Sequence, residues 1–102
     1  MVDIIKSDSK EFRTGITAVN FYIEDSEVCK ELKPLLEKTE KEVDIKFYGC
    51  DINKFKELVK EYEIDAYPTL AFLKDGKLVH KMIGIKKIET IPDVIKEIKG
   101  SK

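Results

Sequence analysis

The segment Ser26-Glu27-Val28-Cys29 is the part of this chain whose residue types and spacing come closest to a known chemistry. It lies between a hydrophobic stretch, Thr17 to Tyr22, and a segment with helical spacing that carries Lys30 and Pro34. Two cysteines separated by two residues at the start of a helix form a dithiol that can be oxidised to a disulfide and reduced again. Here the first of the two positions is serine. The sequence therefore presents a dithiol site that retains only one sulfur.

Ser26 cannot take over the role of a nucleophilic thiol. Its hydroxyl proton is far harder to remove than that of a thiol, and no general base for it is evident. The one histidine, His80, belongs to a predicted strand far along the chain and shows no sign of pairing with Ser26. We interpret Ser26 as the N-cap of the following helix, a position that serine favours.

Cys29 lies one turn into the same predicted helix. A cysteine near a helix N-terminus can keep some thiolate character and remain reactive. The alternative is a semi-buried thiol without chemistry of its own. The residues alone leave both interpretations open.

The composition is that of one globular domain, which we expect to span residues 1–102. Of the 102 residues 42% are hydrophobic, enough for one modest core, and the formal net charge is −1. Interspersed lysine and glutamate predict a solvated surface and give no indication of nucleic-acid binding. No apolar run is long enough to span a bilayer, and the first residues lack the pattern of a signal peptide. We expect a cytoplasmic monomer that binds neither nucleic acid nor membrane.

Hydrophobic periodicity predicts strands and helices in alternation. Strands are indicated by β-branched and aromatic runs, and helices by apolar residues at helical spacing with capping residues before them. Asp75-Gly76 between two apolar runs is a strong signal for a β-hairpin. The predicted strands are 2–6, 17–22, 45–50, 69–73 and 77–83. The predicted helices are a short one from Ser7-Asp8-Ser9 through Phe12, one capped by Ser26, one capped by Asn53, and one starting near Thr90 with Pro92 in its first turn.

This order predicts an α/β fold with a central mixed β-sheet of about five strands flanked by four helices. Right-handed crossovers place the first strands parallel with helices on both faces, and the hairpin adds an antiparallel edge. Pro34 removes one backbone hydrogen bond from the helix that follows Ser26, so we expect that helix to bend.

From Asn20 to Gly84 the chain resembles the thioredoxin family, in register and without a gap. The tetrapeptide 26–29 and Lys30 lie where the family has its redox motif and the lysine after it. Pro34 matches the proline that bends the active-site helix, and Tyr67-Pro68-Thr69 resembles the loop with a cis-proline. The other matches are Phe21, Tyr22, Asp51, Tyr62 and Ile64. The resemblance implies a thioredoxin fold and the thiol–disulfide oxidoreductase class, which serves protein disulfide reduction and cell redox homeostasis without a cofactor.

The departures from the family pattern lie around the motif. Ser26 occupies the position of the nucleophilic cysteine. Asn20 stands where the family usually has a buried acid that helps the second cysteine lose its proton, and Gly49 where a nearby lysine would be. Asp25 replaces a tryptophan, and Glu27-Val28 replaces Gly-Pro. The resemblance thus implies a catalytic site that is impaired in this chain.

The resemblance implies different roles for the two cysteines. Cys29 corresponds to the shielded second cysteine of the motif, which attacks only after the first has captured a substrate. Gly49 would face the active site, so strand alternation turns Cys50 to the opposite side of the sheet. We therefore expect Cys50 to be a small core residue, with no disulfide to Cys29 and no metal on either cysteine.

A peptide-binding groove is also implied by the resemblance. The bond between Tyr67 and Pro68 is expected to be cis, and the backbone of Tyr67 would be offered to an extended substrate. Gly84 and Ile85 would complete the groove as substrate-binding residues. The partners implied are protein or peptide substrates and a thioredoxin reductase.

Three functions remain open. The first is a disulfide reductase whose parent has cysteine at position 26, with Ser26 introduced on purpose. The second is a natural thioredoxin-like protein that has lost its dithiol and binds peptides or partner proteins without catalysis. The third is an unrelated use of the same fold. We favour the redox class, impaired in this chain by Ser26.

Overall fold

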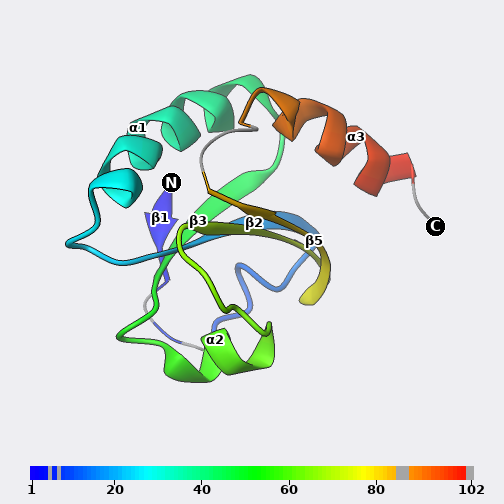
Figure 1. Ribbon diagram of the computed structural model, residues 1–102. Helices are drawn as coiled ribbons and strands as arrows, with labels where there is room; N and C mark the ends of the chain where they lie inside the picture. Colours follow the sequence, from blue (N-terminus) through cyan, green and yellow to red (C-terminus); the bar gives the residue numbers. More distant parts are fainter. Residues whose placement is uncertain (5, 7, 85–87, 101–102) are drawn as a thin grey trace.

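Figure 1 shows the computed structural model, which describes residues 1–4, 6, 8–84 and 88–100. The strands are β1 (Val2–Asp3), β2 (Ile16–Tyr22), β3 (Lys46–Asp51), β4 (Thr69–Lys74) and β5 (Lys77–Ile83). They form one five-stranded sheet in the order β1-β3-β2-β4-β5. The predicted α/β fold with a central mixed sheet is confirmed.

The middle strand of the sheet, β2, leads directly into the Ser26–Cys29 segment. It pairs in parallel with β3 and antiparallel with β4, and β1 pairs in parallel with the other side of β3. All of its residues except the first and the last are buried, as expected for a strand covered on both faces. The antiparallel hairpin of β4 and β5 forms one edge of the sheet, as predicted. Because β2 ends at Tyr22, the chain leaves the centre of the sheet just before Ser26.

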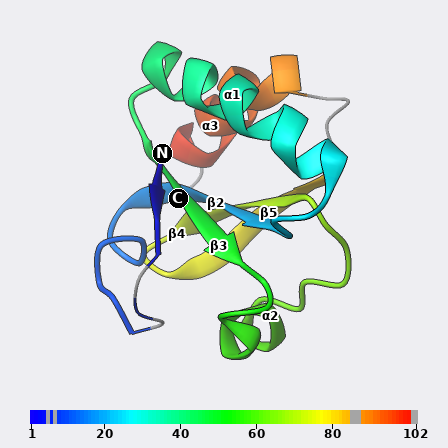
Figure 2. The same ribbon diagram turned by 90° about the vertical axis from the view of Figure 1, so that its left-hand side faces the viewer.

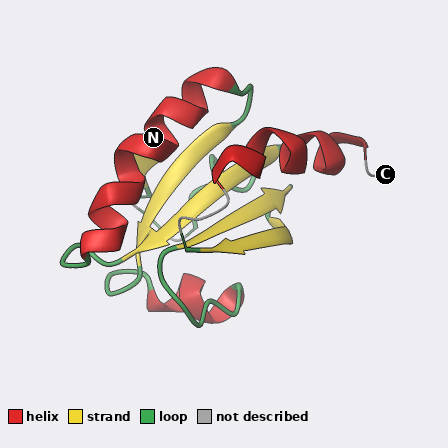
Figure 3. Cartoon of the chain, turned by 45° about the horizontal axis from the view of Figure 1, so that its top comes forward, coloured by secondary structure: helices red, strands yellow, loops and turns green. Residues whose placement is uncertain are grey.

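In the described part of the chain, three α-helices cover the sheet. The first, α1 (Glu27–Glu42), and the last, α3 (Ile91–Gly100), lie on one face, and α2 (Lys56–Glu61) lies on the other (Figure 2). Figure 3 shows the sheet between these two helical layers. A short 3₁₀ helix, Ile88–Thr90, leads directly into α3. Four helices were predicted, so one of them is missing from the described residues.

The sheet divides the interior into two hydrophobic clusters. Towards α1 and α3, Leu36 packs with Phe47 of β3 and Ile95 of α3. Towards α2, Phe21 of β2 packs with Leu58. All five side chains are buried, and full burial of side chains of this size is worth roughly 1.5–3 kcal/mol each. The buried core residues of α1, rather than the Ser26–Cys29 segment, therefore hold this helix against the sheet.

The predicted short helix through Phe12 is wrong, because turns take its place. Thr14 Oγ1 donates to the Lys10 carbonyl at 2.7 Å, and Ser9 Oγ accepts a backbone N–H at 3.4 Å. Serine and threonine side chains that bind nearby backbone groups in this way favour turns over helix. Ser7, part of the predicted cap, lies outside the described residues.

The start of α2 also differs from the prediction, which placed its N-cap at Asn53. The N-cap residue is Phe55, and no side chain caps the helix. Asp51 organises the preceding turn instead. Its Oδ1 accepts the Asn53 N–H at 2.9 Å, and its carbonyl oxygen accepts the Phe55 N–H at 3.1 Å. An aspartate that binds the N–H two residues further on closes a turn by itself, so Asn53 is not needed as a cap.

Candidate functional site

Ser26 caps the N-terminus of α1, as predicted. Its backbone is extended, with φ −83° and ψ 126°, and its Oγ accepts a hydrogen bond from the Cys29 N–H at 3.4 Å. The Ser26 carbonyl accepts the first helical bond, from the Lys30 N–H at 3.0 Å. Glu27 adds a carboxylate to the first turn, where the positive end of the helix dipole favours it. The hydroxyl of Ser26 therefore serves as the N-cap of α1.

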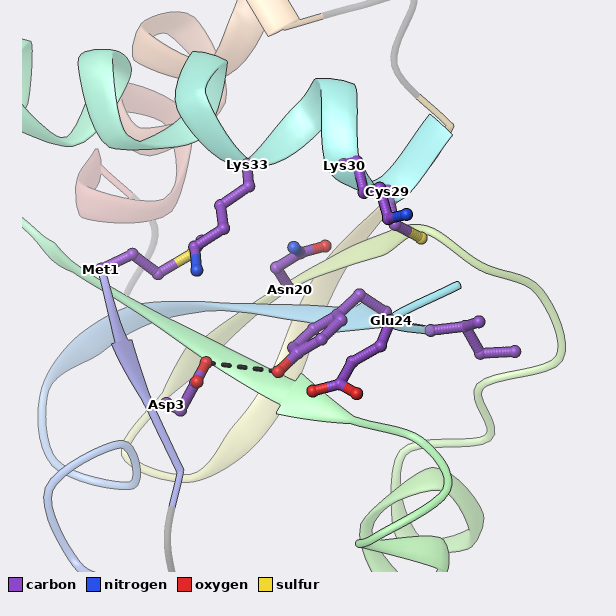
Figure 4. Close-up of a pocket in the computed structure, with 9 residues that line it drawn as sticks. Met1, Asp3, Asn20, Glu24, Cys29, Lys30 and Lys33 are labelled. Carbon is purple, nitrogen blue, oxygen red and sulfur yellow. Dashed lines mark hydrogen bonds between the residues drawn. The ribbon is translucent and has the colours of Figure 1, made fainter. Parts of the chain in front are cut away.

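Cys29 adjoins a cleft between α1 and the sheet, which Figure 4 shows in close-up. The Cys29 side chain is only 4% exposed. The cleft has a volume of about 210 Å³, and residues from β1, from β2 and the segment after it, and from α1 line it. Cys29 is thus nearly buried, but it lies against a hollow rather than inside a packed core.

Asn20 supplies a buried polar group to this cleft. Its side chain is 2% exposed, and its Oδ1 has no hydrogen-bond partner in the described part of the chain. In Figure 4 the Asn20 side chain rises from β2 towards α1, with its oxygen turned to the side on which Cys29 lies. An unsatisfied buried acceptor costs roughly 1–3 kcal/mol. The cleft is therefore suited to receive a hydrogen-bond donor.

Gly49 lies on β3 between two of the residues that line the cleft. Gly49 pairs with Asn20 on one side and with Asp3 on the other. Side chains at paired positions of neighbouring strands point to the same face of the sheet, so Asn20 and Asp3 flank a position that has no side chain. Asn20 and Gly49 stood out in the sequence as departures from the family pattern, but neither this register nor the cleft was predicted. Asp3 was missed altogether, and no local pattern marks it.

Tyr22 lies on the same face of β2, two positions after Asn20. Its hydroxyl donates to Asp3 Oδ1 at 3.5 Å. Partial burial raises the pKa of Tyr22 to about 12, and the carboxylates of Asp3 and Asp51 add to the effect. Tyr22 therefore remains a neutral hydrogen-bond donor at physiological pH and does not serve as a base.

Cys50 is a core residue, as predicted. It is 0% exposed and packs in the cluster on the α2 side of the sheet, with Phe21 and Leu58. Burial raises the pKa of the Cys50 thiol to about 12, with a further contribution from the Asp51 carboxylate. Cys29, by contrast, lies on the α1 side, and both cysteines are free. Cys50 therefore carries almost no thiolate at neutral pH.

The loop before β4 holds the other residues singled out in the sequence. The Tyr67–Pro68 peptide bond is cis, and Tyr67 is 51% exposed while Pro68 is buried. The Gly84 N–H donates to the Pro68 carbonyl at 2.8 Å, so the end of β5 lies beside this loop. Gly84 has φ 82°, a conformation that favours glycine, and a Cβ there would meet no atom within 4 Å. Ile85 lies outside the described residues.

Other chemistry finds little support in the structure. Among the residues that are described, no group of three or more histidine, cysteine, aspartate or glutamate side chains is placed to hold a metal ion. His80 lies on β5, and its ring centroid is 5.8 Å from that of Phe72 on β4. None of the described helices is both long and apolar enough to cross a membrane.

Sequence comparison relates nearly the whole chain to one family. The family model described as Thioredoxin matches residues 3–97. A thioredoxin of Chlamydia caviae is 29% identical over 100 residues, which covers 95% of this chain and 98% of that protein. A thioredoxin of Bacillus subtilis is 28% identical over 92 residues and covers 88% of each chain.

Solved structures show the same relationship at the level of the fold. The reduced thioredoxin pre-protein of Schistosoma mansoni superposes with a TM-score of 0.80 at 25% identity, covering 94% of this chain and 95% of that one. The oxidised mitochondrial thioredoxin 3 of Saccharomyces cerevisiae gives a TM-score of 0.74 at 30% identity and covers 84% and 81%. The two proteins were solved in different redox states, and this chain is similar to both.

Proposed function

The chain belongs to the thioredoxin family, and from this premise we propose that it is a thiol–disulfide oxidoreductase whose own catalysis is impaired by Ser26. In this chemistry a thiolate attacks a substrate disulfide, and a second thiol then attacks the mixed disulfide and releases the reduced substrate. We assign Ser26 to the position of the attacking thiol and Cys29 to that of the resolving thiol.

The observation that carries this proposal is the place of Ser26 at the start of α1. Unpaired N–H groups and the helix dipole at such a position lower the pKa of a thiol and so make it reactive. A serine hydroxyl in the same place stays protonated, and Ser26 Oγ already accepts the Cys29 N–H. Cys29 is 4% exposed, which leaves it poorly placed to attack a protein disulfide unaided.

We propose that the extended substrate binds at Tyr67, Pro68 and Gly84. Tyr67 is 51% exposed and Ile83 is 63% exposed, so large apolar side chains reach the surface on both sides of the Gly84–Pro68 hydrogen bond. Exposed apolar groups that cluster are typical of protein-binding surfaces. A peptide that adds to this backbone in extended form would use strand-like hydrogen bonds.

The alternative is a module that binds peptides or proteins without catalysis. The number of departures around the motif favours it, since Asn20, Asp25 and Gly49 differ from the family pattern as well as Ser26. Such a protein would keep the surface at Tyr67 and Pro68 while its dithiol chemistry is lost. Under this alternative, a cysteine restored at position 26 would bring back no activity.

Reduction of insulin disulfides by dithiothreitol distinguishes the two functions. The unchanged chain should not accelerate the reaction, because Ser26 cannot open a disulfide. Ser26→Cys should restore part of the activity of an ordinary thioredoxin. Adding Cys29→Ser to that variant should abolish turnover again, since the mixed disulfide can no longer be resolved.

Two results would contradict the proposal. Turnover by the unchanged chain would show that Ser26 does not hold the position of the nucleophile. A folded Ser26→Cys variant that neither forms a disulfide nor reduces insulin would favour the binding module, and binding of extended peptides to the unchanged chain would then test that alternative.

The proposal includes a cytoplasmic monomer that receives electrons from a thioredoxin reductase. Two cysteines on opposite sides of the sheet do not make the disulfide framework that is typical of small secreted domains. Oxidation of NADPH by a reductase in the presence of the Ser26→Cys variant would test the electron donor. Light scattering on the purified protein would test the oligomeric state.

A further inference from the structure

The cleft beside Cys29 has two walls of opposite charge. Lys30 and Lys33 project from α1 on one side, and Asp3 and Glu24 come from the sheet side (Figure 4). All four charged side chains are exposed at the rim. Over the described part of the chain, no ion pair joins the two walls. Positive and negative groups thus face one hollow without neutralising each other.

A buried hydrogen-bond acceptor and a cysteine sulfur also belong to the cleft. Asn20 Oδ1 is unpartnered in a side chain that is 2% exposed, and Cys29 lines the same hollow. A buried acceptor of this kind favours a ligand that brings a donor. The volume of about 210 Å³ is below the range of roughly 300–1,000 Å³ that drug-sized ligands occupy. The cleft therefore suits a small molecule and excludes a folded protein.

We propose that this cleft binds a small zwitterionic disulfide, namely the disulfide of an amino-acid thiol, and that Cys29 reacts with it. The ammonium group of the ligand faces Asp3 and Glu24 and donates one hydrogen bond to Asn20 Oδ1. Its carboxylate faces the lysines of α1. In this arrangement Asn20 Oδ1 gains a hydrogen-bond donor, and the ligand contacts both charged walls at once.

The reaction is a single thiol–disulfide exchange. The Cys29 thiol loses its proton to solvent, and the resulting thiolate attacks one sulfur of the ligand. A bond forms between Cys29 Sγ and that sulfur, the disulfide bond of the ligand breaks, and the other half leaves as a thiolate that takes up a proton from water. The ligand is the oxidant, and the product is a chain with a mixed disulfide at Cys29.

This inference goes beyond the proposed reductase function and does not depend on it. The exchange requires neither a thiol at Ser26 nor the surface at Tyr67 and Pro68. The inference is therefore tested on the unchanged chain, whereas the reductase function is tested on the Ser26→Cys variant. Its readout is the mass of the protein and not the turnover of a substrate.

The test compares four small disulfides on the unchanged chain. Cystine is the zwitterionic probe, cystamine carries only ammonium groups, dithiodipropionate carries only carboxylates, and hydroxyethyl disulfide is neutral. Intact-protein mass spectrometry gives the rate of adduct formation, and each rate is divided by the rate of the same disulfide with N-acetylcysteine. Cystine should exceed the neutral probe by about tenfold, since charge contacts with exposed side chains at the two walls contribute about threefold each. Equal normalised rates for all four probes would overturn the inference.

Variants locate the ligand within the cleft. Asp3→Asn and Lys33→Gln change exposed side chains, so both should fold, and each should reduce the preference for cystine by about threefold. Cys29→Ser should form no adduct, while Cys50→Ala, the matched control, should react as the unchanged chain does. Circular dichroism checks the fold of each variant. If Asp3→Asn and Lys33→Gln keep the full preference for cystine, the ligand does not bind between the two walls.

Discussion

The carboxylate of Asp3 occupies the space that a side chain at Gly49 would need. A Cβ atom at Gly49 would overlap with Asp3 Oδ1 and would lie 3.3 Å from the ring of Tyr22. The two residues are paired across β1 and β3, so the overlap follows from the register of these strands. Gly49 and Asp3 are therefore a matched pair, and each restricts which residue the other position accepts.

Replacing Gly49 by alanine should destabilise the fold through this contact. We expect Gly49→Ala to lower the free energy of unfolding by about 1 kcal/mol, the lower end of the cost of overpacking, because the exposed Asp3 carboxylate can turn away. In an Asp3→Ala background the same substitution should cost markedly less, because the obstructing carboxylate is gone. Urea denaturation of the four proteins gives the coupling energy directly. Strictly additive costs would show that the two side chains do not compete for space.

The cap at the start of α1 should contribute measurably to stability. Ser26→Ala removes the acceptor of the Cys29 N–H and should lower the free energy of unfolding by about 0.5–2 kcal/mol. Ser26→Asn is the matched control, since asparagine caps a helix as well as serine does. Thermal or urea unfolding should therefore rank asparagine with serine and above alanine. An alanine variant as stable as the parent would mean that the cap is not formed in solution.

The two cysteines should differ sharply in their reaction with iodoacetamide. Under native, mildly alkaline conditions Cys29 should be alkylated first, because it adjoins the open cleft. Cys50 should remain unmodified, since it is fully buried and its pKa is raised to about 12. In denaturant both should react at similar rates, which provides the control. Mild oxidation should leave the two thiols unlinked, and an internal disulfide found by mass spectrometry would contradict the placement of these residues on opposite sides of the sheet.

Acid should remove the small contribution of the ion pair between Arg13 and Glu61. Arg13 donates two hydrogen bonds to the Glu61 carboxylate, at 2.7 and 2.9 Å, and these bonds hold the pKa of Glu61 below its ordinary value of 4.5. A carboxyl whose pKa is lowered on folding stabilises the fold above its unfolded pKa, and this effect is lost as pH falls through the folded pKa. The pair is partly exposed, so its worth is roughly 0.2–1 kcal/mol.

Glu61→Gln is the variant that measures this contribution. At neutral pH the variant should be slightly less stable than the parent, and the difference should vanish once the pH is well below 4.5. High salt should reduce the difference at neutral pH, because exposed charges are screened. A difference that stays constant from neutral to acidic pH would show that packing, and not charge, is responsible.

Features that depend on neighbouring residues were predictable from the sequence. Ser26 was identified as a helix cap from its type and position alone, and the structure confirms it. Asp75-Gly76 was identified as a hairpin turn, and both residues have positive φ, 52° and 84°, as this tight turn requires. Strand alternation from Gly49, which the family resemblance places towards the active site, put Cys50 on the opposite side of the sheet, and Cys50 is buried there. For Ser26 and the hairpin turn, the deciding interactions lie within a few residues along the chain.

Features that depend on distant segments were not predictable. Asp3 and Asn20 reach the cleft from the two strands that flank Gly49, and no local pattern specifies that register. The turns before β2 were mistaken for a helix, since the same serine and threonine residues can cap a helix or close a turn. Here Thr14 and Ser9 bind backbone groups within the turn, and no helix follows.

The capping geometry of Ser26 has a genetic consequence. Serine and cysteine codons can differ by one base, and the two side chains differ only in the replacement of oxygen by sulfur. A cysteine at this position would inherit the extended backbone of the cap and would point its sulfur where the hydroxyl now lies, at the start of α1. Where position 26 is encoded by a serine codon of that kind, a single point mutation would therefore give a paired dithiol with Cys29.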